Sequence, residues 1–189
     1  FFGDQLVSHL EANKVGTEFI TRADNPTTLA FVKKEPGGHA RYAFFTNGAA
    51  DVAFSPQDVP AELPEKAFFQ FGSISLIPDP SSSTILSLVE REKGKRITSF
   101  DPNIRTVLVS NEGDYRQRVE RAIRAAAIVK VSDEDLEWIF PDESLTLAIN
   151  RVLEMGPRLV VVTQGGDGSL AVTDRGTVNA PAVETKVSD

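Results

Sequence analysis

Over residues 68–162, short apolar runs alternate regularly with amphipathic segments, and few folds accommodate such a pattern. The apolar runs have the length and composition of β-strands, and the segments between them carry apolar residues at helical spacing. The expected strands lie at 68–71, 96–100, 127–131 and 159–162, and the expected helices at 81–92, 114–126 and 145–153. The sequence LVVV at 159–162 is typical of a strand buried on both faces. This order predicts an α/β fold with a doubly wound, mostly parallel sheet in three layers.

Further elements flank this alternation. A helix is expected at 4–13, and strands at 27–32 and 40–45 form a β-hairpin around a polar turn at 33–39. Short strands at 169–172 and 177–178 follow the last parallel strand. A chain of 189 residues is expected to form one domain, 1–189, with the hairpin region 25–50 inserted in it. The hairpin is either a plain edge hairpin, a lid, or a dimer surface.

The composition argues against several classes of function. The formal net charge of -7 argues against a surface for nucleic acid or anionic membranes, which requires clustered Lys and Arg. One group of arginines is interpreted as the solvated face of a helix: Arg116, Arg118, Arg121 and Arg124. The chain has no cysteine for disulfides or thiolate metal sites, and no apolar run long enough to cross a bilayer. We therefore expect a cytoplasmic protein that binds neither nucleic acid nor membranes.

Polar side chains follow the strand at 96–100, in the segment SFDPNIR at 99–105. An open parallel sheet binds ligands outside the carboxyl ends of its strands. Asp101 and Asn103 would suit a simple turn, but Arg105 adds a planar donor that matches a phosphate group. The alternatives are an exposed Arg105 or an internal ion pair between Asp101 and Arg105. We favour a ligand site, because the position on the sheet agrees with the chemistry.

A glycine-rich loop, TQGGDG at 163–168, follows the strand at 159–162. Glycines let backbone N–H groups approach phosphate oxygens closely. The segment after this loop is strand-like and not helical, so the loop fits neither a Walker A motif nor a dinucleotide fingerprint. A phosphate-binding loop and a glycine-rich hairpin turn are therefore both open interpretations.

A serine and three acids, SDED at 132–135, follow the strand at 127–131. Ser132 suits a helix N-cap, and Asp135 stands at the acidic position of a capping box. The same acids at a strand's carboxyl edge could hold Mg²⁺ through water, and the two roles are compatible. The two histidines, His9 and His39, have no partner at ligand spacing, so no imidazole metal site is expected.

The order of these segments resembles the ribokinase-like (PfkB) carbohydrate kinases, and among them most closely the fructokinases and ketodeoxygluconate kinases. The resemblance covers the whole chain. It rests on FG at 2–3, TLAFV at 28–32, AAD at 49–51, FGSISL at 71–76, SFDPNIR at 99–105, KVSDE at 130–134 and VVTQGGDG at 161–168. It implies transfer of the ATP γ-phosphoryl group to a primary hydroxyl of a sugar, with Mg²⁺ and a monovalent cation such as K⁺ as cofactors.

The same resemblance assigns roles to individual residues. It implies that Arg105 is catalytic, at the transferring phosphoryl group, and that Asp135 binds the metal through water, although the family has a longer Glu there. The residues implied on the sugar side are Asp101, Asn103, Phe45 and Thr46, and those beside the nucleotide are Ser132, Thr163, Gly165 and Gly168. Relatives often carry Arg where Thr46 stands. The resemblance therefore favours a neutral sugar, above all fructose, over an acidic one such as ketodeoxygluconate.

The resemblance also implies that parts of the kinase lie outside this chain. The family's Gly-rich sugar motif is expected before Phe1, and its Asp-Thr-x-Gly-Ala-Gly-Asp motif, with the catalytic base, is expected to begin at Asp189. Residues 1–189 alone are then expected to be inactive, with 25–50 as a lid over the sugar and a homodimer surface. The alternatives are a non-catalytic sugar- or nucleotide-binding regulator on the same fold, and a nicotinamide-dependent oxidoreductase, which lacks its glycine fingerprint here.

Overall fold

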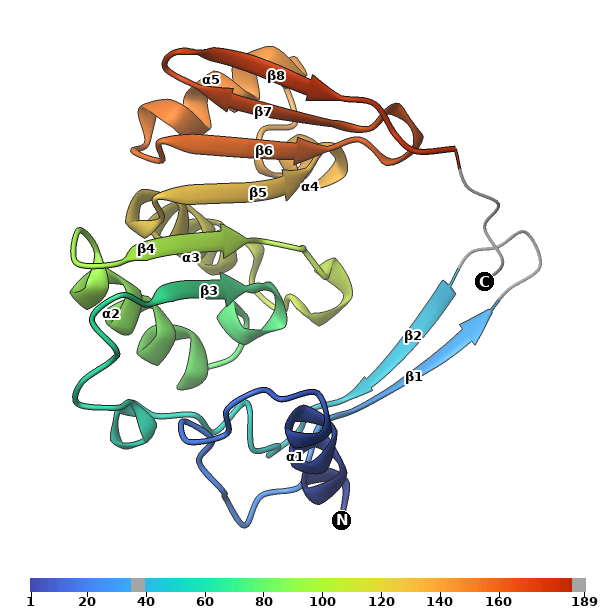
Figure 1. Ribbon diagram of the computed structural model, residues 1–189. Helices are drawn as coiled ribbons and strands as arrows, with labels where there is room; N and C mark the ends of the chain where they lie inside the picture. Colours follow the sequence, from blue (N-terminus) through green and yellow to red (C-terminus); the bar gives the residue numbers. More distant parts are fainter. Residues whose placement is uncertain (35–39, 185–189) are drawn as a thin grey trace.

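The computed structural model describes residues 1–34 and 40–184, and its centre is a six-stranded mixed sheet (Figure 1). The strands are β3 (Phe68–Gly72), β4 (Ile97–Asp101), β5 (Ile128–Ser132), β6 (Leu159–Thr163), β7 (Ser169–Thr173) and β8 (Gly176–Ala180). They lie side by side in chain order. Strands β3 to β6 are parallel, whereas β7 and β8 each run antiparallel to the strand before them. The expected α/β class with a mostly parallel sheet is confirmed.

The helices between the parallel strands gather on one face of this sheet (Figure 1). They are α2 (Ser81–Glu92), α3 (Glu112–Ala125), α4 (Asp133–Ile139) and α5 (Leu145–Glu154). Because each strand pairs with the next one in the chain, crossovers of one hand bring all of them to the same side. Their apolar side chains pack with the strands in a single core, whose fully buried members include Phe100, Leu86, Ile123, Leu136, Val152 and Val160.

The strands bury alternate side chains. In β6, Val160 and Val162 are buried, whereas Leu159 and Val161 on the opposite face are only half-buried. The sequence-based expectation that this strand is covered on both faces therefore holds for only one face within the described residues. Near the carboxyl end of the other face, the side chains are polar, as at Thr163.

Side-chain caps fix the start of three helices. Asn111, Ser132 and Ser144 each accept a hydrogen bond from the backbone N–H three residues further along. Such caps satisfy N–H groups that have no partner inside the helix. The cap at Asn111 explains why α3 begins at Glu112, before the predicted start at residue 114. Among the described residues, no helix has the length and apolarity that a membrane span requires.

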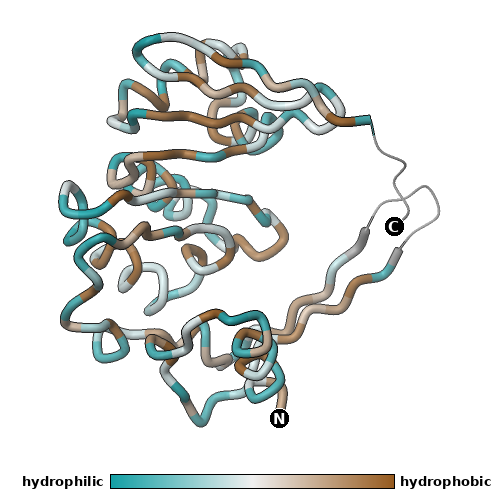
Figure 2. The backbone as a smooth tube through the Cα atoms, viewed as in Figure 1, coloured by the Kyte–Doolittle hydropathy of each residue, from teal (hydrophilic) through white to brown (hydrophobic). Residues whose placement is uncertain are grey.

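A separate two-stranded antiparallel sheet contains β1 (Leu29–Lys34) and β2 (Ala40–Phe45), and it rises beside the carboxyl ends of β3 to β6 (Figure 1). The helix α1 (Phe2–Ala12) lies near its base. Hydrophobic stretches run along both strands, as Figure 2 shows, and Phe31 and Phe45 are 60% and 62% exposed. The two strands of the predicted hairpin are thus present. Of the predicted turn at 33–39, residues 33 and 34 belong to β1, whereas 35–39 with His39 lie outside the described residues, as does Asp189.

A buried ion pair joins the end of α2 to the start of β4. Glu92 is 3% exposed; it pairs with Arg91 at 2.7 Å and also with Arg96. Arg96 donates further hydrogen bonds to the carbonyls of Leu63 and Pro64, the latter at 2.9 Å. Burial opposes ionisation of Glu92, but the two arginines outweigh it and hold the pKa of this carboxyl below its ordinary value.

Replacing Glu92 with glutamine is expected to lower the free energy of unfolding by about 3 kcal/mol, because it leaves the half-buried Arg96 without its counter-charge. Urea denaturation measures this change. Glu90→Gln on the same helix is the matched control, since Glu90 and its partner Arg121 are both exposed, and it should cost less than about 1 kcal/mol. Equal effects of the two substitutions would contradict the prediction.

Candidate active site

The three loops that the sequence analysis singled out, at 101–105, 132–135 and 163–168, lie along one edge of the sheet together with the turn at 72–73. The parallel strands β3 to β6 all end at this edge (Figure 1). Gly72 is the register partner of Asp101, and Ser132 is that of Thr163. A hydrogen bond from the Ile104 N–H to Asp135 Oδ1, 3.0 Å long, connects the two pairs. The loops at 72–73, 101–105, 132–135 and 163–168 therefore form one continuous border.

The turn after β3 requires a glycine. Gly72 has a φ of 138°, and a Cβ at this position would lie 1.9 Å from the carbonyl oxygen of Asp101. The next residue, Ser73, and Asn103 in the neighbouring loop also have positive φ, at 58° and 38°. The two side chains are bonded, with Asn103 Nδ2 donating to Ser73 Oγ at 3.2 Å. Strained backbone of this kind is concentrated at ligand sites.

Asp101 forms an ion pair with Lys130, a residue that the sequence analysis did not include in the site. Lys130 Nζ donates to Asp101 Oδ2 at 3.0 Å. The other oxygen, Oδ1, is buried and has no hydrogen-bond partner among the described residues. The alternative of an ion pair between Asp101 and Arg105 is therefore wrong. One signal could have revealed Lys130: it interrupts the apolar run of β5 with a charge.

Arg105 is half-buried and folds back on its own loop. Its Nη1 donates to the carbonyl oxygens of Ile104 at 3.0 Å and of Asn103 at 3.4 Å. Behind it lies Tyr115, whose pKa is raised to about 12, first by burial and then by the negative charge of Asp135, with Arg105 acting in the opposite direction. Both charges therefore act on the phenol group of Tyr115.

The segment at 132–135 forms the predicted helix cap. Ser132 Oγ accepts a hydrogen bond from the N–H of Asp135 at 3.0 Å, so Ser132 is the N-cap of α4. The Asp135 carboxylate bonds the N–H of Ile104 in the neighbouring loop. Within the described parts of the chain, no group of three His, Cys, Asp or Glu side chains lies close enough to hold a metal ion.

The glycine-rich loop at 163–168 joins two antiparallel strands, as the hairpin-turn interpretation requires. It contains a short 3₁₀ turn, Gly165–Asp167, and is closed by the N–H of Gln164 bonded to the carbonyl of Gly168 at 2.8 Å. Gly168 has a φ of 94°, and a Cβ there would lie 2.2 Å from the carbonyl oxygen of Ala180. Close packing therefore explains Gly168, and the loop presents its backbone next to Ser132.

A cavity of about 890 Å³ lies between the segment 50–67 and strand β3, and Ile85 and Leu88 of α2 also line it. Its polar wall includes Asp51, Asp58, Gly72, Ser73, Asp101 and Asn103. As far as the described residues form it, this wall holds no lysine, arginine or histidine. Phe45 and Thr46 are not part of the wall; the Phe45 ring packs edge-on against Phe31, with centroids 5.6 Å apart.

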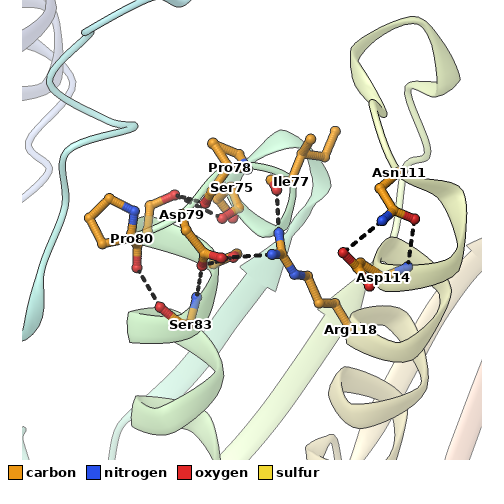
Figure 3. A network of polar contacts seen from close by, with 11 residues as sticks. Ser75, Ile77, Pro78, Asp79, Pro80, Ser83, Asn111, Asp114 and Arg118 are labelled. Atoms are coloured by element: carbon orange, nitrogen blue, oxygen red, sulfur yellow. Dashed lines mark hydrogen bonds and ion pairs between the residues drawn. The ribbon is translucent and has the colours of Figure 1, made fainter.

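A polar network around Asp79 and Arg118 lies just after the 3₁₀ turn that follows β3 (Figure 3). Arg118 of α3 donates to Asp79 Oδ2 at 2.7 Å and to the carbonyl of Ile77. The other carboxylate oxygen of Asp79 accepts hydrogen bonds from Ser82 Oγ at 2.6 Å and from the Ser83 N–H at 3.2 Å. The network therefore joins α3 to the start of α2.

Serine side chains continue this network to the edge of the sheet. Ser81 Oγ donates to the carbonyl of Ser75 at 3.1 Å, and Ser75 Oγ donates to the carbonyl of Gly72 at 2.6 Å. The short 3₁₀ turn Ser73–Leu76 is thus held on both sides. As a result, the helix layer fixes the position of Ser73 in the cavity wall.

The Asp79 network makes stability depend on pH. The hydroxyl of Ser82 lowers the pKa of Asp79 below its ordinary value of 3.8; partial burial opposes this, and the Ser83 N–H and Arg118 add to it. A lowered pKa in the folded state contributes stability above the unfolded-state pKa, and this contribution is lost as the pH falls through the folded-state pKa. We expect Asp79→Asn to destabilise the protein at pH 7 and the difference from the wild type to shrink below about pH 4. Thermal unfolding of both proteins between pH 7 and about pH 3 measures this stability difference. A difference that stays constant across the pH range would contradict the prediction.

The whole chain matches one protein family. The sequence profile of the pfkB family carbohydrate kinases aligns with residues 1–189. The chain belongs to this family. Fructokinase from Rhizobium leguminosarum bv. trifolii is 34% identical over 187 residues, which cover 99% of this chain and 57% of that protein. The sequence-based resemblance is therefore confirmed.

Solved structures agree with this family assignment. Fructokinase from Vibrio cholerae O395, in its fructose, ADP and calcium ion bound form, superimposes with a TM-score of 0.87 at 25% identity, over 98% of this chain and 60% of that one. Aminoimidazole riboside kinase from Salmonella enterica superimposes with a TM-score of 0.84 at 25% identity, over 99% and 61%. The fold is thus the ribokinase-like α/β fold of sugar kinases. The chain spans about three fifths of the length of these relatives.

Proposed function

We propose that the protein containing this chain is an ATP-dependent sugar kinase that transfers the γ-phosphoryl group to a primary hydroxyl of a neutral sugar, most of all fructose, in the cytoplasm. The observation that carries the proposal is the single border formed by the loops at 72–73, 101–105, 132–135 and 163–168. A kinase must hold a triphosphate and an acceptor side by side, and this border offers donors for both. The fructokinase relatives support the choice of reaction.

On the sugar side, Asp101, Asn103 and Ser73 supply hydrogen-bond acceptors and donors to hydroxyl groups from the cavity wall. Arg105 turns from its own loop carbonyls toward the transferring phosphoryl group and neutralises charge there. Phosphoryl transfer needs mainly such positioning and neutralisation, because little covalent chemistry falls to the protein.

On the nucleotide side, Ser132, Thr163, Gly165 and Gly168 place hydroxyl groups and backbone beside the phosphates. A lone carboxylate such as Asp135 fits a Mg²⁺ ion that is held through water and by the phosphates, rather than a protein cage. When bound with ATP, Mg²⁺ neutralises negative charge on the phosphates. A monovalent cation such as K⁺ is a further proposed cofactor.

The charge of the cavity supports a neutral sugar. Asp51, Asp58 and Asp101 line it without a cationic side chain among the described wall residues, and Thr46 offers no charge either. An acidic sugar such as ketodeoxygluconate would meet carboxylates without a counter-charge, which disfavours binding. Ketodeoxygluconate kinase is therefore the less favoured activity.

The hairpin of β1 and β2 is proposed to act as a lid over the sugar and as a homodimer surface. Its exposed side chains, which include Phe31, Val32, Tyr42 and Phe45, form an apolar surface that gains from being covered. Closure over the sugar would exclude water and so limit wasteful hydrolysis of ATP. Light scattering of the full-length protein tests the dimer, and a monomer at all concentrations would refute it.

The experiment that tests the function uses the full-length protein with ATP, Mg²⁺ and a panel of neutral and acidic sugars, with ADP formation as the readout. Turnover with a neutral sugar, strongest with fructose, is the expected result. ADP formation no higher than that without sugar would favour the alternative of a non-catalytic sugar- or nucleotide-binding regulator. In that case, calorimetry with sugar and with ATP would show binding without turnover.

A further inference from the structure

Lys130 is a charged residue between two buried valines in a strand of the core sheet. Its neighbours Val129 and Val131 are buried against the helices, whereas Lys130 points to the opposite face and its side chain is 43% exposed. Lysine is depleted in strands, so its presence here needs a physical reason. Stability alone is a weak reason for the lysine, because half-exposed ion pairs contribute little to the free energy of folding.

Asp101, the partner of Lys130, has one carboxylate oxygen in a hydrogen bond and one without a described partner. Lys130 Nζ donates to Oδ2 of Asp101, while Oδ1 is buried without a hydrogen-bond partner among the described residues. A buried carboxylate oxygen without a donor is costly, so this oxygen needs a donor beyond the described residues, such as a water molecule or a ligand hydroxyl. Asp101 lines the cavity of about 890 Å³, and Lys130 does not.

We propose that Lys130 is a positioning residue for sugar binding. This inference rests on the proposed function. The ammonium group holds one oxygen of Asp101, which fixes the rotation of the carboxylate and presents Oδ1 to a sugar hydroxyl. It also offsets the charge of Asp101, which shares the cavity wall with Asp51. Lys130 therefore acts on the sugar through Asp101, without touching it.

The test replaces Lys130 with methionine in the full-length protein. Methionine keeps much of the length and apolar surface of the lysine stem but removes the donor and the charge. We expect the KM for the sugar to rise about tenfold, as for a lost hydrogen bond to a charged group. The KM for ATP should change less than twofold, and kcat less than the sugar KM. Lys130→Arg should restore the sugar KM, because arginine can also hold the carboxylate.

Two controls separate this role from a general loss of structure. Lys93→Met removes an exposed lysine before the amino end of β4 and should leave both KM values unchanged. The melting temperature of Lys130→Met should stay within about 3 °C of the wild type, as for a half-exposed pair. A sugar KM that is unchanged in Lys130→Met, or that rises together with the ATP KM and is not restored by arginine, would overturn the proposal.

A second measurement tests the role of Lys130 even if the proposed function is wrong. If the wild-type protein phosphorylates no sugar, the proposed function fails, and crystal structures of the wild type and Lys130→Met then decide the role of Lys130. A carboxylate of Asp101 that rotates in the variant supports the positioning role. A carboxylate that keeps its orientation refutes it.

Discussion

Replacing Arg105 with alanine in the full-length protein is expected to lower the turnover rate about 100-fold, as does the loss of other donors that stabilise charge in a transition state. The hydrogen bonds that Arg105 makes here go to carbonyls of its own loop, at Ile104 and Asn103. The guanidinium can therefore leave them when phosphates arrive. Steady-state kinetics with ATP and fructose measures the change, and most of the loss should be in kcat.

The matched control for this experiment is Arg124→Ala. Arg124 is exposed on α3 and pairs with Glu120 on the same helix at 2.8 Å, away from the border of loops. Its removal should leave kcat unchanged. Arg105→Lys should recover only part of the lost rate, since lysine keeps the charge but not the planar fork. If Arg105→Ala keeps full turnover with an unchanged melting temperature, Arg105 has no part in catalysis.

Replacing Gly72 with alanine is expected to have the largest effect on stability, a loss of at least about 3 kcal/mol. The added Cβ would overlap the carbonyl oxygen of Asp101, which is 1.9 Å from its ideal position, and the φ of 138° is unfavourable for any side chain. Relief of the overlap requires β3 and β4 to separate where the cavity wall begins. Urea denaturation measures the loss, and sugar binding should weaken with it.

The substitution Gly94→Ala serves as a control. It shows how much of the cost at Gly72 comes from the positive φ and how much from the contact with Asp101. Gly94 also has a positive φ, 79°, but an added Cβ meets nothing within 4 Å. Its substitution should therefore cost only the conformational penalty, about 1–2 kcal/mol. An equal cost at the two glycines would mean that the contact between Gly72 and Asp101 is not what demands a glycine.

The main elements of the fold could be predicted because they depend on local patterns. Apolar runs such as LVVV at 159–162 and the helical spacing of 145–153 each indicate an element without reference to the rest of the chain. Parallel strands end at one edge of a sheet, and this general rule predicts that the loops after them lie close together. The face of β6 that the described helices leave uncovered could not be foreseen, because an unbroken apolar run does not indicate which face is covered.

The pairing of site residues could be predicted less well. The sequence analysis placed Asp101 in the site and considered an ion pair with Arg105 only as an alternative, whereas the structure pairs Asp101 with Lys130, which the analysis did not consider. Which side chains meet across two strands depends on register, and register is not encoded near either residue. The bond from Ile104 to Asp135 was missed for the same reason: it joins loops 31 positions apart.

The sequential strand order has a consequence for how the chain folds. Each parallel pairing in β3 to β6 joins segments roughly 30 residues apart, the span of one βαβ unit. Within the described sheet, none of these strands must wait for a distant part of the chain, so the entropy lost in closing each loop stays small. The described sheet can grow strand by strand as the polypeptide leaves the ribosome, with β7 and β8 added through tight reversals.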